Sequence, residues 1–195
     1  MTAFRLGLTG SIGMGKSTTA GFFIAAGIPV WDADAAVHRL YARGGAAVAP
    51  LAALCPAALQ DGAIDRGALK SWIAADPAAL PSIEAVVHPL VAVDRAAFQP
   101  PTDIVVFDIP LLFEKGTEAD MDATLVVTAP AALQRARVLA RPGMTDAGLA
   151  AILSRQMPDS EKRARATHII ETLGLDAARH AVAALIIYIR ETRHA

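Results

Sequence analysis

The 195-residue sequence contains no asparagine, a single cysteine and few aromatic residues. Because a disulfide needs two cysteines, the lone Cys55 excludes an internal disulfide and a zinc site built from several cysteines. The aromatic fraction of 5% and the formal net charge of −1 argue against a nucleic-acid surface based on stacking and positive charge. No apolar run reaches the roughly 20 residues that a membrane-spanning helix needs.

The N-terminus also lacks the basic region, apolar core and cleavage site of a secretory signal, and no segment indicates an obligate protein partner. These absences predict a cytoplasmic protein that binds neither membrane nor nucleic acid. What the sequence has in abundance is alanine, within a hydrophobic fraction of 54%. Because alanine is the best helix former, much of the chain outside its strands is expected to be helical.

A glycine-rich segment near the N-terminus carries the strongest functional signal. Residues 10–17 match the phosphate-binding P-loop pattern G-x-x-x-x-G-K-[ST]. An apolar run at 4–9 is a plausible strand before the loop, and residues 18–26 can form a helix that ends at Gly27. Strand, glycine loop and helix in this order predict a nucleoside triphosphate site. The alternative is a glycine-rich turn capped by Ser17.

Each residue type in the loop has a physical role. The glycines let backbone N–H groups approach phosphate oxygens, and the following helix adds unpaired N–H groups and the positive end of its dipole. Lys16 is expected to reach the β- and γ-phosphates of ATP, and the Ser17 hydroxyl to ligate Mg²⁺. The loop residues predicted to bind ATP are Ser11, Ile12, Gly13, Met14, Gly15, Lys16, Ser17 and Thr18.

Short apolar runs alternate with helical stretches at residues 4–9, 28–31, 104–107, 123–128 and 168–170. Nearly continuous apolar character is typical of parallel strands that are covered on both faces. The pattern therefore predicts an α/β fold of the P-loop NTPase, nucleotide-kinase-like type: a three-layer sandwich around a parallel five-stranded sheet. A single domain over 1–195 is expected, with ligands beyond the carboxyl ends of the strands.

Two segments depart from the alternation. Between the second and third strands, Pro77, Pro81 and Pro89 are expected to break helical stretches, and the segment predicts a helical acceptor-binding insertion over approximately 35–100. The second segment, approximately 131–166, is rich in basic residues, as a helix pair that closes as a lid over polyphosphate would be. Charge alone favours an ordinary solvated helical surface there.

Two aspartates follow the second strand. Asp32 and Asp34 point to the same side of an extended chain, because side-chain direction repeats every two residues. One carboxylate can accept the proton of an attacking hydroxyl while the other, or both, holds Mg²⁺ through water. Taken alone, such a pair is equally well explained as a turn or a helix cap.

Further motifs follow in one order along nearly the whole chain: Leu8–Thr18, Asp32-Ala33-Asp34, His88-Pro89-Leu90, Asp108–Glu114, Arg155-Gln156-Met157 and Glu161-Lys162. Together they resemble the dephospho-CoA kinase family, whose members catalyse the last step of coenzyme A biosynthesis. The resemblance implies transfer of the ATP γ-phosphoryl group to the ribose 3′-hydroxyl of dephospho-CoA. ATP is then the co-substrate, dephospho-CoA the acceptor and Mg²⁺ the metal.

On the acceptor side, the resemblance makes Asp34 the general base and gives Asp32 a supporting role at the site or the metal. Arg39 and His88 are implied to bind the acceptor. From the residues alone, Arg39 equally suits an ion pair with a surface carboxylate. For His88, the residues alone favour a histidine that simply ends a helix before Pro89.

The segment after the third strand is implied to complete the acceptor site. Leu111, Leu112 and Phe113 would form an apolar wall with Glu114 at its rim, although plain core explains the three apolar residues equally well. Asp108 is in a position like that of a Walker B aspartate. It is expected either to order Mg²⁺ through water or to cap a turn.

In the basic segment, Arg141 is the predicted lid arginine, because a planar fixed cation stabilises charge spread over phosphate oxygens. Arg137 is the alternative for that role, and Arg155 with Gln156 is expected to contact nucleotide on closure. The sequence departs from the family pattern at Ser11, Met14, Ala166-Thr167-His168 and Glu171-Thr172. These departures bear on the contacts to adenine more than on the reaction.

Rival functions are separated by particular features. Another P-loop kinase for a nucleotide or small metabolite shares loop and fold, but the Asp32/Asp34 and His88 motifs favour dephospho-CoA. A GTP-driven switch typically reads guanine through Asn-Lys-x-Asp, which a chain without asparagine cannot supply. A nucleic-acid-binding ATPase would use the basic segment, yet the necessary positive charge and aromatic residues are missing.

Overall fold

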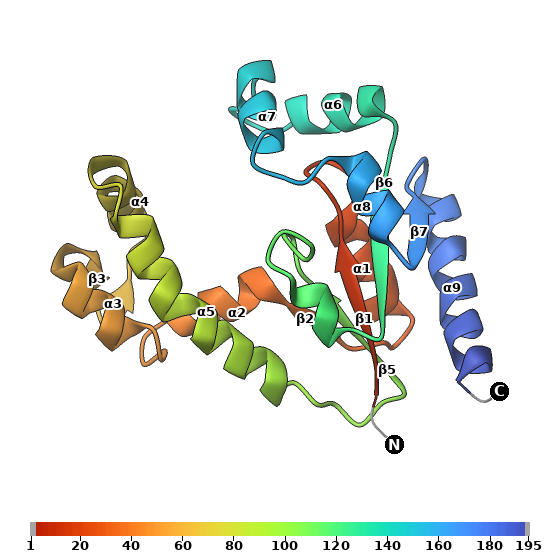
Figure 1. The fold of residues 1–195 in the computed structure, drawn as a ribbon, viewed down its shortest axis with the longest axis horizontal. Coiled ribbons are helices and arrows are strands. Elements are labelled where there is room, and N and C mark those ends of the chain that lie inside the picture. Colours follow the sequence, from red (N-terminus) through yellow and green to blue (C-terminus); the bar gives the residue numbers. More distant parts are fainter. Residues whose placement is uncertain (1–2, 194–195) are drawn as a thin grey trace. The chain divides into compact units, whose positions relative to one another are not determined.

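A computed structural model of the chain describes residues 3–193 (Figure 1). The chain forms two compact units. One consists of the segment up to Trp31 together with the segment from Pro100 onward, and the other is Asp32–Gln99. The second unit has bounds near those of the helical insertion expected at 35–100.

The first unit is built on a five-stranded sheet in the order β2 (Val30–Asp32), β5 (Ile104–Asp108), β1 (Phe4–Thr9), β6 (Ala123–Thr128) and β7 (His168–Glu171). Strand β1 pairs in parallel with β5 and β6, and β6 pairs in parallel with β7. The α/β fold with a parallel five-stranded sheet is therefore confirmed. Strands β5 and β6 are buried along their whole length, which explains their continuous apolar runs.

Helices α1 (Lys16–Ala25) and α9 (Leu175–Thr192) pack on each other and on the sheet, as Figure 1 shows. Their apolar faces close a core around fully buried Leu6, Leu8 and Leu125. Burial of a leucine side chain contributes about 1.5–3 kcal/mol, so this core holds the loop between β1 and α1 on a rigid base.

The basic segment forms three helices rather than the expected helix pair: α6 (Ala131–Leu139), α7 (Asp146–Leu153) and α8 (Asp159–Arg165). Gly143 has a φ of +74° in the turn between α6 and α7, a conformation that favours glycine. Pro158 then caps α8 and separates it from α7. A short 3₁₀ helix, η2 (Thr117–Asp120), lies between β5 and β6.

The second unit contains four α-helices, a 3₁₀ turn and a two-stranded hairpin: α2 (Ala33–Tyr41), α3 (Val48–Leu54), η1 (Pro56–Ala58), β3 (Leu59–Gln60), β4 (Ala63–Ile64), α4 (Arg66–Ala75) and α5 (Ala79–Ala97). It has its own apolar core, in which Leu51, Leu69 and Ile83 are buried. Helices α2 and α5 pack directly on each other.

The expectation that proline breaks the helices of this unit holds at Pro77 and is wrong at Pro81 and Pro89. Helix α4 ends before Pro77, but α5 runs through both later prolines. Pro81 lies in the first turn of α5, where backbone N–H groups have no acceptor within the helix. Pro89 lies inside α5, so the packing of that helix outweighs one lost hydrogen bond.

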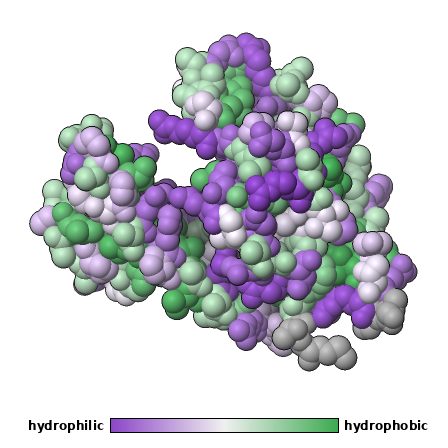
Figure 2. Space-filling model, viewed as in Figure 1, coloured by the Kyte–Doolittle hydropathy of each residue, from purple (hydrophilic) through white to green (hydrophobic). Residues whose placement is uncertain are grey.

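Hydrophilic and hydrophobic residues are interspersed on the face of the molecule that Figure 2 shows. This agrees with 18 basic and 19 acidic residues in the sequence. None of the helices within residues 3–193 is both long and apolar enough to span a bilayer.

Candidate active site

The P-loop lies between the end of β1 and the start of α1. Gly13 and Gly15 have φ values of +77° and +88°, which residues with a Cβ rarely adopt. Packing restricts both positions as well. A Cβ at Gly13 would lie 2.6 Å from Cγ2 of Val138, and one at Gly15 would lie 3.0 Å from Oγ1 of Thr172. Packing against α6 therefore restricts Gly13, which the motif leaves free, and packing against Thr172 after β7 restricts Gly15, which the motif requires.

Helix α1 begins at Lys16 without a side-chain cap on its first N–H groups. Such N–H groups and the helix dipole form a site for an anion. Ser17 and Thr18 are exposed in this first turn. The arrangement gives the loop the geometry of a phosphate cradle.

Lys16 Nζ forms an ion pair with Oδ1 of Asp108. Asp108 ends β5 and stands opposite Leu8 in the register with β1, so this carboxylate lies beside the start of the P-loop. The Asp108 side chain is only 3% exposed. A buried carboxylate next to the P-loop lysine provides the negative oxygen that a Walker B-like position requires.

Met14, which departs from the family pattern, does not disturb the loop. Its side chain is 3% exposed and belongs to the main core of the first unit. The N–H of Ala129 donates a hydrogen bond to its sulfur at 3.1 Å. The backbone of Met14 thus remains part of the P-loop, while its side chain packs in the core beneath the loop.

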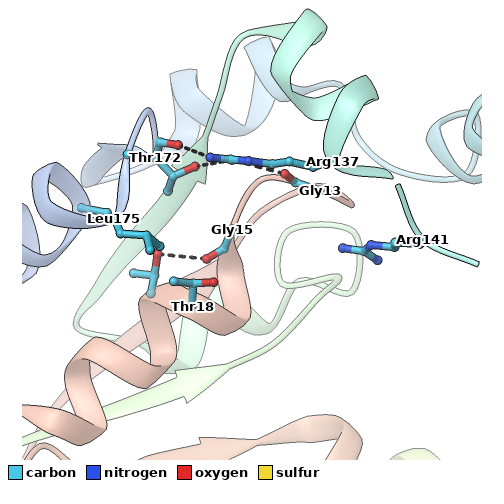
Figure 3. Close-up of a pocket in the computed structure, with 10 residues that line it drawn as sticks. Gly13, Gly15, Thr18, Arg137, Arg141, Thr172 and Leu175 are labelled. Atoms are coloured by element: carbon cyan, nitrogen blue, oxygen red, sulfur yellow. Dashed lines mark hydrogen bonds between the residues drawn. The ribbon is translucent and has the colours of Figure 1, made fainter. Parts of the chain in front are cut away.

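A cavity of about 210 Å³ opens beside the loop (Figure 3). Its lining comes from the P-loop, α1, α6 with the turn after it, the turn after β7 and the start of α9: Gly13, Gly15, Thr18, Thr19, Arg137, Arg141, Thr172, Gly174, Leu175 and Ala178. The cavity lies at the carboxyl end of the sheet, where ligands bind in open α/β folds.

The guanidinium of Arg137 forms hydrogen bonds within the protein. It donates to Oγ1 of Thr172 at 2.9 Å, to the Thr172 carbonyl at 2.5 Å and to the Gly13 carbonyl at 3.5 Å. The Thr172 hydroxyl in turn donates to the Met14 carbonyl at 2.8 Å. Arg137 and Thr172 therefore clamp the P-loop, as Figure 3 shows.

Arg141 lies at the same cavity but is exposed. No ion pair within residues 3–193 engages its guanidinium. Of the two lid arginines that the sequence singled out, Arg141 thus has the side chain that can turn toward a polyphosphate. Arg155 is also exposed, at the end of α7.

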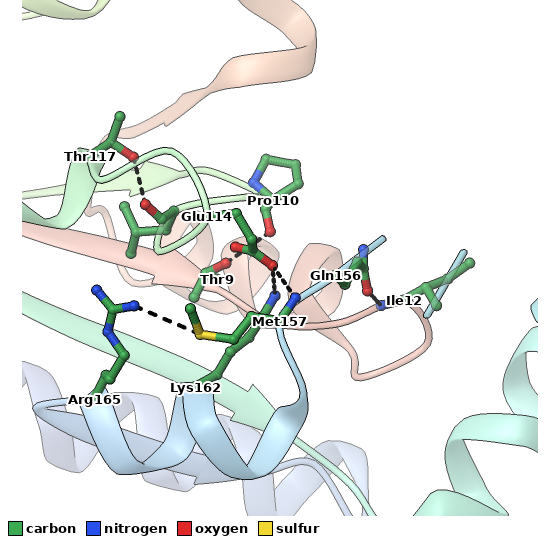
Figure 4. A network of polar contacts seen from close by, with 10 residues as sticks. Thr9, Ile12, Pro110, Glu114, Thr117, Gln156, Met157, Lys162 and Arg165 are labelled. Carbon is green, nitrogen blue, oxygen red and sulfur yellow. Dashed lines mark hydrogen bonds and ion pairs between the residues drawn. The ribbon is translucent and has the colours of Figure 1, made fainter. Parts of the chain in front are cut away.

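Glu114 holds the segment from Met157 to Lys162, between α7 and the sheet (Figure 4). Its Oε1 accepts a hydrogen bond from the N–H of Met157 at 2.8 Å and forms an ion pair with Lys162 Nζ at 2.9 Å. Burial alone would raise the pKa of Glu114, but the contacts with Lys162 and Met157 outweigh it and hold that pKa below its usual range. Glu114 is therefore an anionic anchor.

The apolar residues before Glu114 are mostly interior. Leu112 is fully buried and Phe113 is 4% exposed, whereas Leu111 is half-buried. The guanidinium of Arg165 stacks over the Phe113 ring, 4.9 Å from its centroid. Any apolar surface that this segment offers to an acceptor comes first from Leu111.

Two buried residues of this region, Lys162 and Gln134, were given no role in the site from the sequence, although Lys162 belongs to the Glu161-Lys162 motif. Lys162 is 0% exposed, and Gln134 of α6 is 7% exposed and donates to the Ile12 carbonyl at 2.8 Å. Gln156, which belongs to a family motif, accepts from the Ile12 N–H at 3.3 Å. Helical spacing places Gln134 one turn from Val138, so the apolar face of α6 was the available signal.

In the second unit, Asp32 caps α2 by accepting a hydrogen bond from the N–H of Ala35 at 2.8 Å. Asp34 lies in the first turn of the same helix and is exposed. The helix-cap interpretation thus applies to Asp32 and leaves the Asp34 carboxylate accessible.

Arg39 and His88 belong to the two helices that pack together in that unit. Arg39 on α2 forms an ion pair with Asp94 on α5 at 2.6 Å. This is the pairing with a surface carboxylate that the residues alone allowed. His88 is 3.7 Å from Glu84 and 53% exposed. The alternative that His88 ends a helix is wrong, since α5 continues to Ala97.

Within residues 3–193, no cluster of three or more histidine, cysteine, aspartate or glutamate side chains forms a ready-made metal site. A cation bound with ATP does not need one, because phosphate oxygens and waters supply most ligands of Mg²⁺. The exposed Ser17 hydroxyl and the Asp108 carboxylate are oxygen donors of the type that Mg²⁺ prefers. The residues present fit such an ion.

A family model described as dephospho-CoA kinase matches residues 4–175. A dephospho-CoA kinase of Cereibacter sphaeroides is 72% identical over 197 residues, covering 100% of both chains. A solved structure from Thermus thermophilus is 38% identical with a TM-score of 0.82, covering 96% of this chain and 98% of the other. The dephospho-CoA kinase structure of Campylobacter jejuni, 21% identical with a TM-score of 0.67, covers 95% and 96% and shares the fold.

Proposed function

The chain belongs to the dephospho-CoA kinase family and functions as a dephospho-CoA kinase, and we propose that Lys16, Asp34 and Arg141 carry its reaction. The reaction transfers the γ-phosphate of ATP to the ribose 3′-hydroxyl of dephospho-CoA and yields coenzyme A and ADP. The observation that carries this conclusion is the family match over residues 4–175, joined to an intact P-loop with its lysine beside a buried aspartate.

On the ATP side, the N–H groups of the P-loop and of the first turn of α1 bind the phosphates. Lys16 exchanges its contact with Asp108 for the β- and γ-phosphates. Arg141 turns inward on closure and stabilises the charge that spreads over the transferring group. The proposed ATP contacts are Ser11, Ile12, Gly13, Met14, Gly15, Lys16, Ser17, Thr18, Arg141 and Arg155.

Mg²⁺ is part of the proposal. Ser17 would hold it directly, and Asp108 and Asp34 would hold it through water. Bound there, the ion neutralises phosphate charge. Asp108 is available for this role because it ends β5 beside the start of the P-loop.

On the acceptor side, the exposed Asp34 carboxylate accepts the proton of the 3′-hydroxyl as its oxygen attacks the γ-phosphate. Asp32 supports this position by fixing the start of α2. The further acceptor contacts that we propose are Arg39, His88, Leu111, Leu112 and Phe113. The exposed His88 and the half-buried Leu111 support that set most directly.

We also propose that the chain works as one kinase domain over 1–195, with the 35–100 region binding the acceptor and the 131–166 region closing as a lid. Closure excludes water and so limits wasteful ATP hydrolysis. A cytoplasmic location is proposed because the substrate ATP is supplied there.

The function is tested by incubating the purified protein with ATP, Mg²⁺ and dephospho-CoA and reading the products by mass spectrometry. Coenzyme A and ADP are expected in equal amounts, and Lys16→Ala is expected to form neither. If the protein binds ATP but phosphorylates a nucleoside monophosphate and not dephospho-CoA, it is a kinase for a different acceptor. No transfer to any acceptor would contradict the kinase function.

The role of Asp34 is tested by Asp34→Asn, which removes the proton acceptor but keeps the size of the side chain. The turnover number is expected to fall about 10²–10⁴-fold, the usual contribution of a general base, with ATP affinity unchanged. Asp61→Asn is the matched control, since Asp61 is an exposed carboxylate of the same unit. Normal turnover of Asp34→Asn would show that another group accepts the proton.

A further inference from the structure

The segment after β5 and helix α8 are joined by a buried ion pair. Lys162 is fully buried, and the Glu114 side chain is 16% exposed. The second carboxyl oxygen of Glu114, Oε2, is buried without a hydrogen-bond partner. Breaking this pair would leave an uncompensated charge in the interior, so neither residue can move away from the other at low cost.

A second joint connects the same two segments. Arg165 of α8 forms an ion pair with Glu118 and stacks on the ring of Phe113. Glu118 lies in η2, four residues beyond Glu114. Because both joints link α8 to the stretch from Phe113 to Glu118, this stretch and α8 form one rigid piece. Figure 4 shows the first joint, between Glu114 and Lys162.

The rigid piece reaches the P-loop through Gln156. The Met157 N–H is held by Glu114, and the adjacent Gln156 accepts from the N–H of Ile12 at 3.3 Å. On its other side, the Ile12 carbonyl accepts from Gln134 of α6 at 2.8 Å. The Ile12 residue is thus held by the first helix of the lid and by the return of the lid to the sheet.

We propose that Glu114 is a positioning residue, which couples the apolar wall at Leu111–Phe113 to the lid and the P-loop, and is not a contact of the acceptor. Both oxygens of Glu114 lie within the protein, one engaged by Lys162 and Met157 and one buried. An acceptor that presses on the wall displaces Glu114, and the displacement passes through Met157 and Gln156 to the Ile12 N–H beside the phosphates.

This coupling rests on the proposed function, because the wall and the lid are assigned there. Its consequence is that ATP is aligned for transfer only when an acceptor occupies the wall. The coupling thereby suppresses reaction of ATP with water, the need that any kinase lid must meet.

The test is a double-mutant cycle with Glu114→Gln, Lys162→Met and the combined variant. For each, the turnover number, the KM values for ATP and dephospho-CoA, and ATP hydrolysis without acceptor are measured well below the melting temperature. Glu191→Gln is the matched carboxylate control, because Glu191 is exposed near the end of α9. Thr128→Val is the structural control, since the Thr128 hydroxyl ties α8 to β6 through Asp159 and does not contact the wall.

With Glu114→Gln, turnover is expected to fall about 10- to 100-fold, as small displacements at a phosphoryl-transfer site do. Hydrolysis relative to transfer is expected to rise, while the KM for dephospho-CoA stays within about twofold. Adding Lys162→Met is expected to recover most of the loss, because no buried charge remains unpaired and the introduced amide oxygen still accepts from the Met157 N–H. Thr128→Val is expected to lower the melting temperature and leave the ratio of hydrolysis to transfer unchanged.

A tenfold rise in the KM for dephospho-CoA, unaffected by Lys162→Met, would overturn the proposal and make Glu114 an acceptor contact. Wild-type ratios of hydrolysis to transfer in Glu114→Gln would overturn it as well. Neither of these two results for Glu114→Gln bears on the proposed function, as long as the wild-type protein transfers phosphate to dephospho-CoA. Absence of transfer in the wild type would overturn the proposed function and the coupling with it.

Discussion

At the scale of single residues, the P-loop is restricted by contacts outside itself. Gly13 lies against Val138 of α6, and Gly15 lies against Thr172 after β7. Both glycines combine a left-handed backbone with no space for a Cβ. A substitution at either position must therefore distort the loop or displace its neighbour, α6 at Gly13 and Thr172 at Gly15.

Gly13→Ala is expected to weaken ATP binding at least about tenfold, since it adds both backbone strain of about 1–3 kcal/mol and a clash with Val138. Isothermal titration with ATP and Mg²⁺ measures the effect. Gly21→Ala is the control, because Gly21 is inside α1 with no atom within 4 Å of its added Cβ. That control is expected to keep ATP affinity and to stabilise the protein by about 0.5–1 kcal/mol. Equal ATP affinity of both variants would contradict the packing argument.

His168 on β7 makes stability depend on pH. Burial lowers its pKa, and its ring packs edge-on against Tyr188 at a centroid distance of 5.7 Å. The unfolded chain, with a histidine pKa of about 6.5, takes up a proton before the folded chain does. This contribution to stability is therefore complete above the unfolded pKa and is lost as the pH falls toward the folded one.

His168→Gln is expected to reduce the loss of unfolding free energy between pH 7.5 and pH 5. The comparison with wild type needs urea denaturation at several pH values, because the variant also loses the contact with Tyr188. That loss shifts the curve by the same amount at all pH values, whereas the titration changes its slope. Parallel curves for both proteins would show that His168 does not cause the pH dependence.

At the scale of elements, side-chain caps hold the starts of two helices of the second unit, α2 and α4. Asp32 accepts from the Ala35 N–H at the start of α2, and Asp65 accepts from the Ala68 N–H at 2.6 Å at the start of α4. The cap at Asp32 fixes the helix that carries Asp34 and Arg39. The cap at Asp65 holds a helix of the second unit that carries none of the proposed site residues.

Asp65→Ala is expected to destabilise the protein by about 1 kcal/mol, the usual cost of losing an N-cap, with little effect on turnover. Chemical denaturation and steady-state rates measure the two effects. Lys70→Ala on an exposed position of the same helix is the control and is expected to change stability by less than about 0.5 kcal/mol. A large fall in turnover from Asp65→Ala would show that α4 takes part in the reaction.

At the scale of the whole molecule, ligand binding and folding are linked. The cavity beside the P-loop is lined by residues from 13 to 178, so a nucleotide bound there would contact segments far apart in the sequence. A ligand that binds only the folded state stabilises all of them together.

ATP with Mg²⁺ at about one hundred times its dissociation constant is expected to stabilise the protein by about 2.7 kcal/mol, or about 5–10 °C in melting temperature. Differential scanning fluorimetry measures the shift. Removing Mg²⁺ with EDTA is expected to reduce it, because phosphate charge is then less compensated. Lys16→Ala is expected to abolish it. A shift that is the same with and without EDTA would contradict a role for Mg²⁺ in ATP binding.

Local features of the sequence were sufficient for the α/β fold, the five strands and the P-loop. The runs that became β5 and β6 are buried on both faces, so their apolar character shows in the sequence itself. The P-loop pattern is equally local, because its glycines, lysine and serine are adjacent along the chain. Local rules failed at Pro81 and Pro89, where packing decides whether a helix continues.

Only the tertiary structure decided which polar side chains meet. Lys162 and Glu114 are 48 residues apart, and Arg137 reaches Thr172 across 35 residues. No periodicity encodes such pairs, since their proximity depends on the order of strands in the sheet. The sequence by itself therefore determined the chemistry that the chain has available. The fold decided which basic side chains can reach a phosphate and which are held inside the protein, because burial and pairing follow from packing.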